Sequence, residues 1–143
     1  MLETIPVIGG IEDTIAHLRG HGIAVLLTTI SWTFASRVMA NRFGFDGYSG
    51  YVMEYLPDGT LSGELGRECD EFGKRDFVIG YCRDRGIPLD RVFAVGDSRF
   101  DVPLFQTVGH SVAINASDHA IEAATCAVRT ADLRDVLPLI PGL

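Results

Sequence analysis

Apolar and polar positions form two kinds of pattern along the chain, and the two kinds follow one another. Segments whose pattern predicts a helix are 11–18, 33–43, 74–85, 100–108, 118–124 and 133–139. Short continuous apolar runs, typical of strands buried on both faces of a sheet, are 23–27, 91–95, 110–114 and 126–128. Strand and helix thus alternate. This order predicts an α/β fold with a mostly parallel, Rossmann-like sheet flanked by helices, in a single domain over residues 1–143.

One stretch departs from this alternation. Tyr51–Tyr55 and Thr60–Ser62 have the composition of short strands, and Pro57-Asp58-Gly59 stands between them. An Asp-Gly pair flanked by two such runs is a strong local signal for a tight turn. The sequence therefore predicts a β-hairpin inserted into the α/β core.

Composition narrows the classes of partner. The 143 residues carry a formal net charge of -7, and 47% of them are hydrophobic. This apolar content supports a folded core, and the negative charge makes a nucleic-acid backbone an unfavourable partner. No apolar run has the length of a membrane span, and the first residues lack the pattern of a signal peptide. The cysteines are far apart and form no metal or disulfide pattern. We therefore expect a cytoplasmic protein with no membrane or nucleic-acid partner.

The strongest chemical pattern is an apolar strand that runs into Gly96-Asp97, followed four residues after Asp97 by Asp101. Two carboxylates placed in this way can share a hard cation, with water and phosphate oxygens completing the coordination. The structural alternative is that Asp97 ends a strand and Asp101 lies in the first turn of a helix, where acidic residues are favoured. The pattern favours a metal site at Asp97 and Asp101.

Two hydroxyl residues and a lysine are further candidates. Thr28 and Thr29 follow the apolar run 23–27, and in open parallel sheets ligands bind at the carboxyl ends of the strands. A hydroxyl beside backbone N–H groups can hold a phosphate oxygen, although threonine also commonly caps helices. Lys74 follows Gly73 at the predicted start of a helix, where the helix dipole disfavours a cation. Lys74 is therefore either paired with an acid or an anion, or a solvated surface lysine.

Taken in order, these residues resemble the motifs of the haloacid dehalogenase-like phosphatases. That family has a hydroxyl residue, then a lysine, then a Gly-Asp-x-x-x-Asp pattern, which here are Thr29, Lys74, and Asp97 with Asp101. Further segments resemble the phosphoserine phosphatase branch of the family: Ile5–Ile11, Glu54–Gly63 and Ala113–Ala116. The resemblance covers almost the whole chain and extends the α/β prediction to this family's core.

The resemblance implies a phosphomonoester hydrolase with Mg²⁺ as its cofactor and a small phosphorylated metabolite as its partner. Asp97 and Asp101 would bind the metal ion. Thr29 would hold a phosphate oxygen, with Thr28 as the competing choice, and Lys74 would also contact the phosphate and offset its charge. The catalytic residues implied in this way are Lys74, Thr29 and Asp97.

One motif of the family is absent from this sequence. Its first strand ends in Asp-x-Asp, where the first aspartate attacks phosphorus, and no Asp-x-Asp precedes Thr29. The resemblance places that strand centrally, between the Thr29 and Asp97 strands. We therefore expect a core that is amino-terminally truncated relative to the family and lacks both this strand and the cap domain. An open sheet would favour homodimers or strand exchange.

Two functions remain open. The chain is either part of a phosphatase that is inactive by itself, or a non-catalytic metal-binding, phosphate-binding or interaction protein of the same fold. Retention of Thr29, Lys74 and the acidic pair favours the first. A receiver-like signalling domain is disfavoured by the hairpin and by the late position of the acidic pair.

Overall fold

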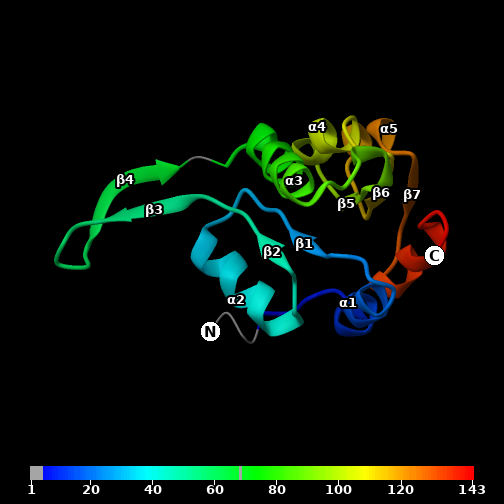
Figure 1. Cartoon of the computed structure of the whole chain (residues 1–143), viewed down its shortest axis with the longest axis horizontal. Helices are drawn as coiled ribbons and strands as arrows, with labels where there is room; N and C mark the ends of the chain where they lie inside the picture. Colours follow the sequence, from blue (N-terminus) through cyan, green and yellow to red (C-terminus); the bar gives the residue numbers. More distant parts are fainter. Residues whose placement is uncertain (1–4, 68) are drawn as a thin grey trace.

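The computed structural model describes residues 5–67 and 69–143, and its helices and strands follow the predicted order, with an additional short strand at Gly47–Tyr48 that was not predicted (Figure 1). The elements are α1 (Ile11–Gly20), β1 (Leu26–Leu27), α2 (Thr33–Phe43), β2 (Gly47–Tyr48), β3 (Val52–Tyr55), β4 (Leu61–Arg67), α3 (Glu71–Arg85), η2 (Leu89–Arg91), β5 (Phe93–Gly96), η3 (Arg99–Asp101), α4 (Val102–Phe105), β6 (His110–Ile114), α5 (Asp118–Ala123), β7 (Cys126–Val128) and η4 (Leu133–Leu139). The α/β class is confirmed. Figure 1 shows α3, α4 and α5 gathered on one side of the body and α1 and α2 on the other, with strands between them.

Several boundaries differ from the predicted ones for local reasons. In the apolar run 23–27 only Leu26–Leu27 forms a strand, because the Val25 amide donates to the Asp46 carboxylate (2.8 Å) instead of to a neighbouring strand. Helix α3 begins three residues before the predicted start, since the Asp70 side chain accepts from the Gly73 amide (2.8 Å) and caps the helix. The predicted helix 100–108 is instead a 3-10 turn followed by the short α4.

The parallel strands form two separate sheets. Strand β1 pairs with β2, and β5, β6 and β7 pair in that order. The middle strand β6 is buried on both faces, since its neighbouring residues Val112 and Ala113 are both fully inaccessible. The apolar run that predicted this strand is explained by this two-sided burial.

Helix α3 packs against both parallel sheets. Its Val78 and Cys82 lie in a buried cluster with Ala94 of β5, and Leu26 of β1 packs against the same cluster. On β2, a Cβ atom added to Gly47 would lie 3.5 Å from the Phe77 ring of α3. The two sheets therefore contact one shared core.

Strands β1 and β5 each lie at an edge of their sheet, with one side toward which no described strand pairs. Within residues 5–67 and 69–143, β1 pairs only with β2, and β5 pairs only with β6. Val95 of β5 is 39% exposed, whereas the preceding Ala94 is 6% exposed. Strands of parallel sheets are normally covered on both faces, so this exposure marks β5 as incompletely covered. The open edges agree with the expected absence of a strand between the Thr29 and Asp97 strands.

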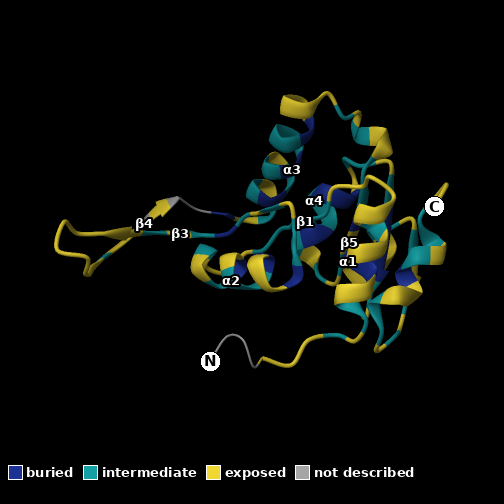
Figure 2. Ribbon diagram, turned by 60° about the horizontal axis from the view of Figure 1, so that its bottom comes forward, coloured by how far each residue is buried: buried dark blue, intermediate teal, exposed yellow. Residues whose placement is uncertain are grey.

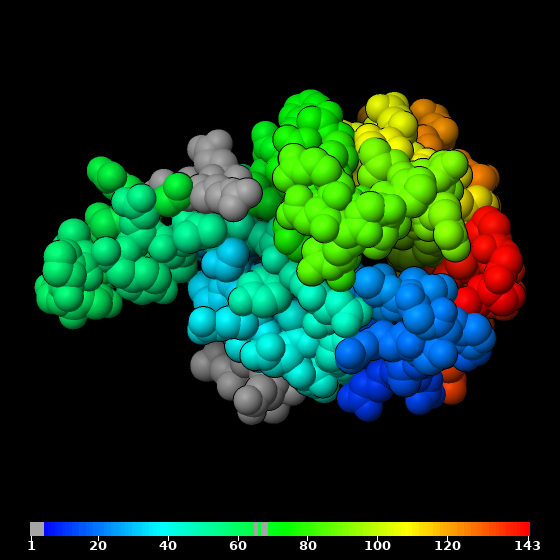
Figure 3. All heavy atoms as spheres, viewed as in Figure 1, coloured from blue at the N-terminus to red at the C-terminus, as the bar shows by residue number. Residues whose placement is uncertain are grey.

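The predicted hairpin is confirmed and projects from the body (Figures 1 and 3). Gly59 adopts a positive φ of 84° at its turn, and the Thr60 amide donates to the Asp58 carboxylate (2.9 Å). Figure 2 shows that most of β3 and of the hairpin turn is exposed, and Tyr55 and Leu61 are among its exposed apolar side chains. Among the described residues, no helix is both long and apolar enough to span a bilayer.

Candidate functional site

The centre of the candidate site is an ion pair between Lys74 of α3 and Asp101 of η3. The Lys74 Nζ atom lies 2.5 Å from Asp101 Oδ1, and the two residues are 7% and 4% exposed. Lys74 occupies the first turns of α3 and its amide donates to the Asp70 carbonyl (3.0 Å). Of the two alternatives for Lys74, pairing with an acid is therefore confirmed.

The second oxygen of Asp101 organises the loop that follows β5. Asp101 Oδ2 accepts from the backbone amides of Asp97 (3.0 Å) and Ser98 (3.1 Å), and from the Ser98 hydroxyl (3.3 Å). Ser98 and Asp101 form a capping box at the start of η3. The four-residue spacing of the acidic pair thus places the second carboxylate beneath the end of the strand.

Gly96 makes this arrangement sterically possible. A Cβ atom added to Gly96 would lie 2.4 Å from the Asp101 carboxyl carbon, which is closer than non-bonded atoms approach. The glycine of the Gly-Asp-x-x-x-Asp pattern is therefore needed for close approach of the Asp101 side chain to the strand.

Asp97 has the opposite environment to Asp101. It is exposed at the carboxyl end of β5, and its side chain has no hydrogen-bond or ionic partner within the part of the chain that the structure describes. Its backbone is fixed, because its amide donates to Asp101 and its carbonyl accepts from the Ser117 amide (2.9 Å). A rigid backbone therefore presents a carboxylate that is open to solvent.

Thr28 and Thr29 lie at the carboxyl end of β1, in the other parallel sheet. Both are half-buried, and Thr29 Oγ1 accepts from the Ser31 amide (3.0 Å). Among the described residues, no hydrogen bond or ion pair links either threonine to Lys74 or Asp101. The structure thus links Lys74, Asp97 and Asp101 through hydrogen bonds in which the described threonines Thr28 and Thr29 take no part.

The donor set fits a divalent cation only in part. Mg²⁺ favours oxygen ligands such as the exposed Asp97 carboxylate, and water and phosphate oxygens commonly complete its shell. The described residues contain no group of three or more His, Cys, Asp or Glu side chains arranged to hold a metal ion. Of the two carboxylates, only that of Asp97 has no partner among the described residues.

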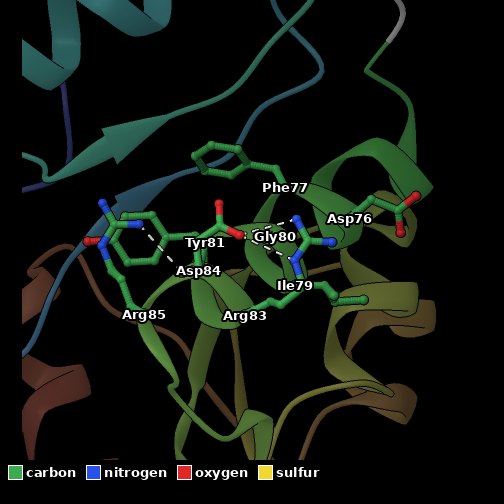
Figure 4. Close-up of a pocket in the computed structure, with 8 residues that line it drawn as sticks. All are labelled: Asp76, Phe77, Ile79, Gly80, Tyr81, Arg83, Asp84 and Arg85. Carbon is green, nitrogen blue, oxygen red and sulfur yellow. Dashed lines mark hydrogen bonds and ion pairs between the residues drawn. The ribbon is translucent and has the colours of Figure 1, made fainter.

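A hollow on the described surface lies elsewhere. It has a volume of about 510 Å³ and is lined by α3 residues between Asp76 and Arg85 (Figure 4). Its charges are already paired, with Arg83 3.2 Å from Asp84, and the Arg85 guanidinium lies over the Tyr81 ring. None of the sequence-predicted site residues lines this hollow, and it gives no sign of a reactive centre.

Sequence reasoning missed three residues that shape the site. Ser98 and Ser117 hold the Asp97 loop through hydrogen bonds, and Asp70 sets the start of the helix that carries Lys74. The capping pattern Ser-x-x-Asp at Ser98 and a capping aspartate at Asp70, three residues before Gly73, are visible in the sequence. The hydrogen bond from Ser117 depends on the tertiary arrangement and has no local signal.

Comparisons with known proteins identify relatives of this chain. Residues 70–137, which include Lys74, Asp97 and Asp101, match the family model described as haloacid dehalogenase-like hydrolase. A phosphoserine phosphatase of Albidiferax ferrireducens is 29% identical over 135 residues, which are 91% of this chain and 56% of that protein. One from a Polaromonas strain is 31% identical over 83% of this chain and 52% of that protein. The chain thus spans about half the length of these curated relatives.

Solved structures give the same result for the fold. A substrate-bound phosphoserine phosphatase complex superimposes with a TM-score of 0.86 at 26% identity, over 97% of this chain and 66% of that one. A phosphoserine phosphatase in apo form superimposes with a TM-score of 0.87, also at 26% identity, over 97% of this chain and 70% of that one. The chain therefore belongs to the haloacid dehalogenase-like hydrolase superfamily and lies in its phosphoserine phosphatase-like branch.

Proposed function

We propose that the chain forms the phosphate-binding and charge-stabilising part of a Mg²⁺-dependent phosphomonoester hydrolase that acts on a small phosphorylated metabolite. The observation that supports this most directly is the buried Lys74–Asp101 pair beside the exposed Asp97, at the carboxyl end of β5. In α/β sheets this is the edge at which ligands bind. A buried lysine with an anchored ammonium offers a fixed positive charge to a phosphoryl group.

Each residue has a separate task in this proposal. Asp97 holds the cation, which when bound would neutralise charge on the phosphoryl oxygens. Lys74 offsets the negative charge of the same group, and Thr29 donates a hydrogen bond to one of its oxygens from the end of β1. Thr28 is the neighbouring hydroxyl that could take the same task.

The proposed reaction needs a nucleophile, and in the family this is the first aspartate of an Asp-x-Asp motif. No Asp-x-Asp occurs anywhere in the sequence. The Ser98 hydroxyl donates to Asp101, and no histidine contacts Ser98 among the described residues, so Ser98 lacks a base. We therefore expect no turnover by this chain alone, and we place the missing nucleophile on a strand that would pair with the open edges of β1 and β5.

The second candidate is a non-catalytic protein that binds a metal ion or a phosphorylated ligand. The observation in its favour is the absence of Asp-x-Asp. Under this alternative, Asp97 and Lys74 would still bind their ligands, but restoring an Asp-x-Asp segment would give no turnover.

The deciding experiment measures phosphate release from phosphoserine and from an aryl phosphate with Mg²⁺ present. The 143-residue chain is compared with the same chain joined to an upstream segment that carries Asp-x-Asp and a helical cap. We expect release only by the extended protein, and its loss on Asp97→Asn or on replacement of the first added aspartate. Release by the 143-residue chain that Asp97→Asn abolishes would show that the nucleophile lies within it. An extended protein that folds but releases no phosphate would favour the non-catalytic alternative.

The open sheet edges lead to a proposal about association. Strands β1 and β5 each have a second edge that pairs with no described strand, and Val95 of β5 exposes apolar surface. Such edges commonly pair with another chain. We expect homodimers or strand exchange, to be measured by light scattering across a concentration series. A stable monomer at high concentration would contradict this.

A further inference from the structure

We infer that the projecting β3–β4 hairpin is an arm through which two copies of this chain bind each other, each hairpin lying against α2 of the other copy. The inference goes beyond the proposed function, and its surface differs from the open edges of β1 and β5. It follows from what the hairpin leaves uncovered and from the surface at its base.

The turn end of the hairpin exposes apolar side chains. The hairpin projects from the body (Figures 1 and 3), and Tyr55, Leu56 and Leu61 are 59%, 48% and 53% exposed. Tyr55 and Leu61 are opposite each other in the strand pairing, so they form one cross-strand apolar pair. A two-stranded hairpin is only marginally stable by itself in water. Packing of this end against another surface would therefore stabilise it.

The accessible surface of the chain is large enough to supply such an interface. It amounts to 8560 Å², whereas a compact monomer of this mass has roughly 7,200 Å². The projecting hairpin contributes to this excess. The excess of roughly 1,300 Å² is larger than the area of about 800 Å² that each partner buries in a standard protein–protein interface.

A hollow at the base of the hairpin offers a place for the other copy to dock. It has a volume of about 200 Å³ and is formed by the first turns of α2 together with β2 and β3. The exposed rings of Phe34 and Tyr48 line it, and Arg37 supplies its one charged group. Small-molecule sites commonly have about 300–1,000 Å³, so this hollow is small for a metabolite. It suits a single side chain that anchors a protein interface.

Charge favours a second copy as the protein that docks. Helix α2 contains Arg37 and Arg42 and no acidic residue. The hairpin, residues 51–67, carries three acidic residues and one basic residue: Glu54, Asp58, Glu64 and Arg67. Among the described residues, the side chains of Arg37, Glu54 and Glu64 have no hydrogen-bond or ionic partner. The positive α2 and the negative hairpin are thus complementary and unpaired.

The shape of one copy keeps these two surfaces apart. The turn end of the hairpin lies beyond α2 in both ribbon views (Figures 1 and 2). In two copies related by a twofold axis, each hairpin can lie along α2 of the other copy, and the same contact forms twice. The apolar turn end and the acidic side chains of one hairpin then meet the hollow and Arg37 of the other copy.

Charge exchange tests this arrangement in the 143-residue chain, with the dimer dissociation constant measured by analytical ultracentrifugation. One variant is Arg37→Glu, and the other combines Glu54→Lys with Glu64→Lys. Each variant alone brings like charges together in both contacts, so dimerisation should weaken at least about tenfold. In an equimolar mixture an acidic α2 meets a basic hairpin and an unaltered α2 meets an acidic hairpin. The mixture should therefore regain the dimer as a heterodimer.

Three outcomes would overturn the inference. The first is an unaltered chain that is monomeric at every concentration, which would leave this surface to a different partner. The second is dimerisation that neither variant weakens, as expected if the copies pair through the edges of β1 and β5. The third is a mixture that stays monomeric although circular dichroism shows both variants folded. Phosphate release plays no part in these measurements, so they are decided separately from the proposed function.

Two further variants complete the test. Arg91→Glu, at an exposed arginine of η2, changes the net charge as Arg37→Glu does. It should change the dimer dissociation constant by no more than about twofold at physiological salt, where distant charges are screened. Equal weakening by the two variants would show general repulsion and would overturn the specific contact. Tyr55→Ser removes the most exposed apolar ring of the hairpin and should weaken the dimer at least about tenfold. An unchanged dimer would exclude the hairpin from the interface.

Discussion

The two ends of the candidate site are built in different ways. At the end of β5, Lys74 and Asp101 are buried, form an ion pair and fix the neighbouring amides. At the end of β1, Thr28 and Thr29 are half-buried, and the one side-chain bond that the structure gives there is local, from the Ser31 amide to Thr29. The β5 end is therefore complete before any ligand arrives, whereas the β1 end has little to hold it in a fixed relation to Lys74.

The difference follows from sheet pairing and core packing. Strand β5 pairs with β6, which pairs with β7, and the Asp101 side chain of the ion pair packs against Gly96 at the end of β5. Strand β1 is only Leu26–Leu27, pairs with the equally short β2, and has an open second edge. A strand placed between β1 and β5 would connect the two ends. Preorganisation at one end and openness at the other fit the proposal that a further strand pairs between them.

The largest effect expected from this comparison is the loss of stability on Asp101→Ala. The change leaves the buried Lys74 ammonium without a counter-charge and removes the acceptor for the Asp97 and Ser98 amides. Breaking a buried pair in this way typically costs about 3–5 kcal/mol. Lys74→Ala should cost less, because the remaining carboxylate keeps its hydrogen-bond donors.

Urea denaturation followed by circular dichroism gives both free energies of unfolding. The order of the two variants is the informative result. If Lys74→Ala cost more than Asp101→Ala, the amide contacts of Asp101 would contribute little, and the β5 end would be less organised than its geometry indicates.

The second effect concerns the glycine beneath the ion pair. Gly96→Ala introduces a Cβ atom 2.4 Å from the Asp101 carboxyl carbon, so that side chain must move. Overpacking of this kind typically costs about 1–3 kcal/mol. Gly80→Ala is the matched control, because a Cβ atom at Gly80 in α3 meets no described atom within 4 Å. Equal free energies of unfolding for the two variants would show that the contact at Gly96 is readily relieved.

The β1 end should respond very little by the same measure. Thr29→Ala removes one exposed hydrogen bond to the Ser31 amide, so we expect a change within about 0.5 kcal/mol in the free energy of unfolding. Phosphate affinity should nevertheless fall in the extended protein that carries Asp-x-Asp, because Thr29 is proposed to contact a phosphate oxygen there. A large loss of stability would mean that the β1 end is as organised as the β5 end.

The sequence predicted the β5 end better than the β1 end, and the reason is physical. The pattern around Gly96-Asp97 and Asp101 is local: a strand, a close approach and a capping turn, all within ten residues. The Lys74–Asp101 pair spans 27 residues, so the sequence left its pairing open. The apolar run 23–27 predicted a five-residue strand. Strand length depends on the partner strands, and among the described strands β1 pairs only with β2. Just before β1, the Val25 amide donates to the Asp46 carboxylate. Local patterns therefore located the residues, whereas their burial and pairing required the tertiary structure.

The smallest effect comes from an exposed ion pair that serves as the reference for the buried one. Asp132 accepts from the Arg134 amide (2.9 Å) and pairs with the Arg134 guanidinium, and these hydrogen bonds lower the pKa of the Asp132 carboxyl below its usual 3.8. A carboxyl whose pKa is lower in the folded state stabilises that state above the unfolded pKa and loses this contribution as the pH falls through the folded value. In an exposed position the contribution is small and salt-sensitive. We therefore expect a slight difference in urea midpoint between the unaltered chain and Asp132→Asn near pH 6. This difference should shrink as the pH falls below about 4, and it should also shrink in high salt.

For Asp101→Asn the difference in urea midpoint near pH 6 should be large and should persist in salt, because water and ions do not reach the buried pair. Similar salt dependence for the two variants would show that the Lys74–Asp101 pair is hydrated in solution, and the contrast between the two ends of the site would then be weaker than the structure indicates.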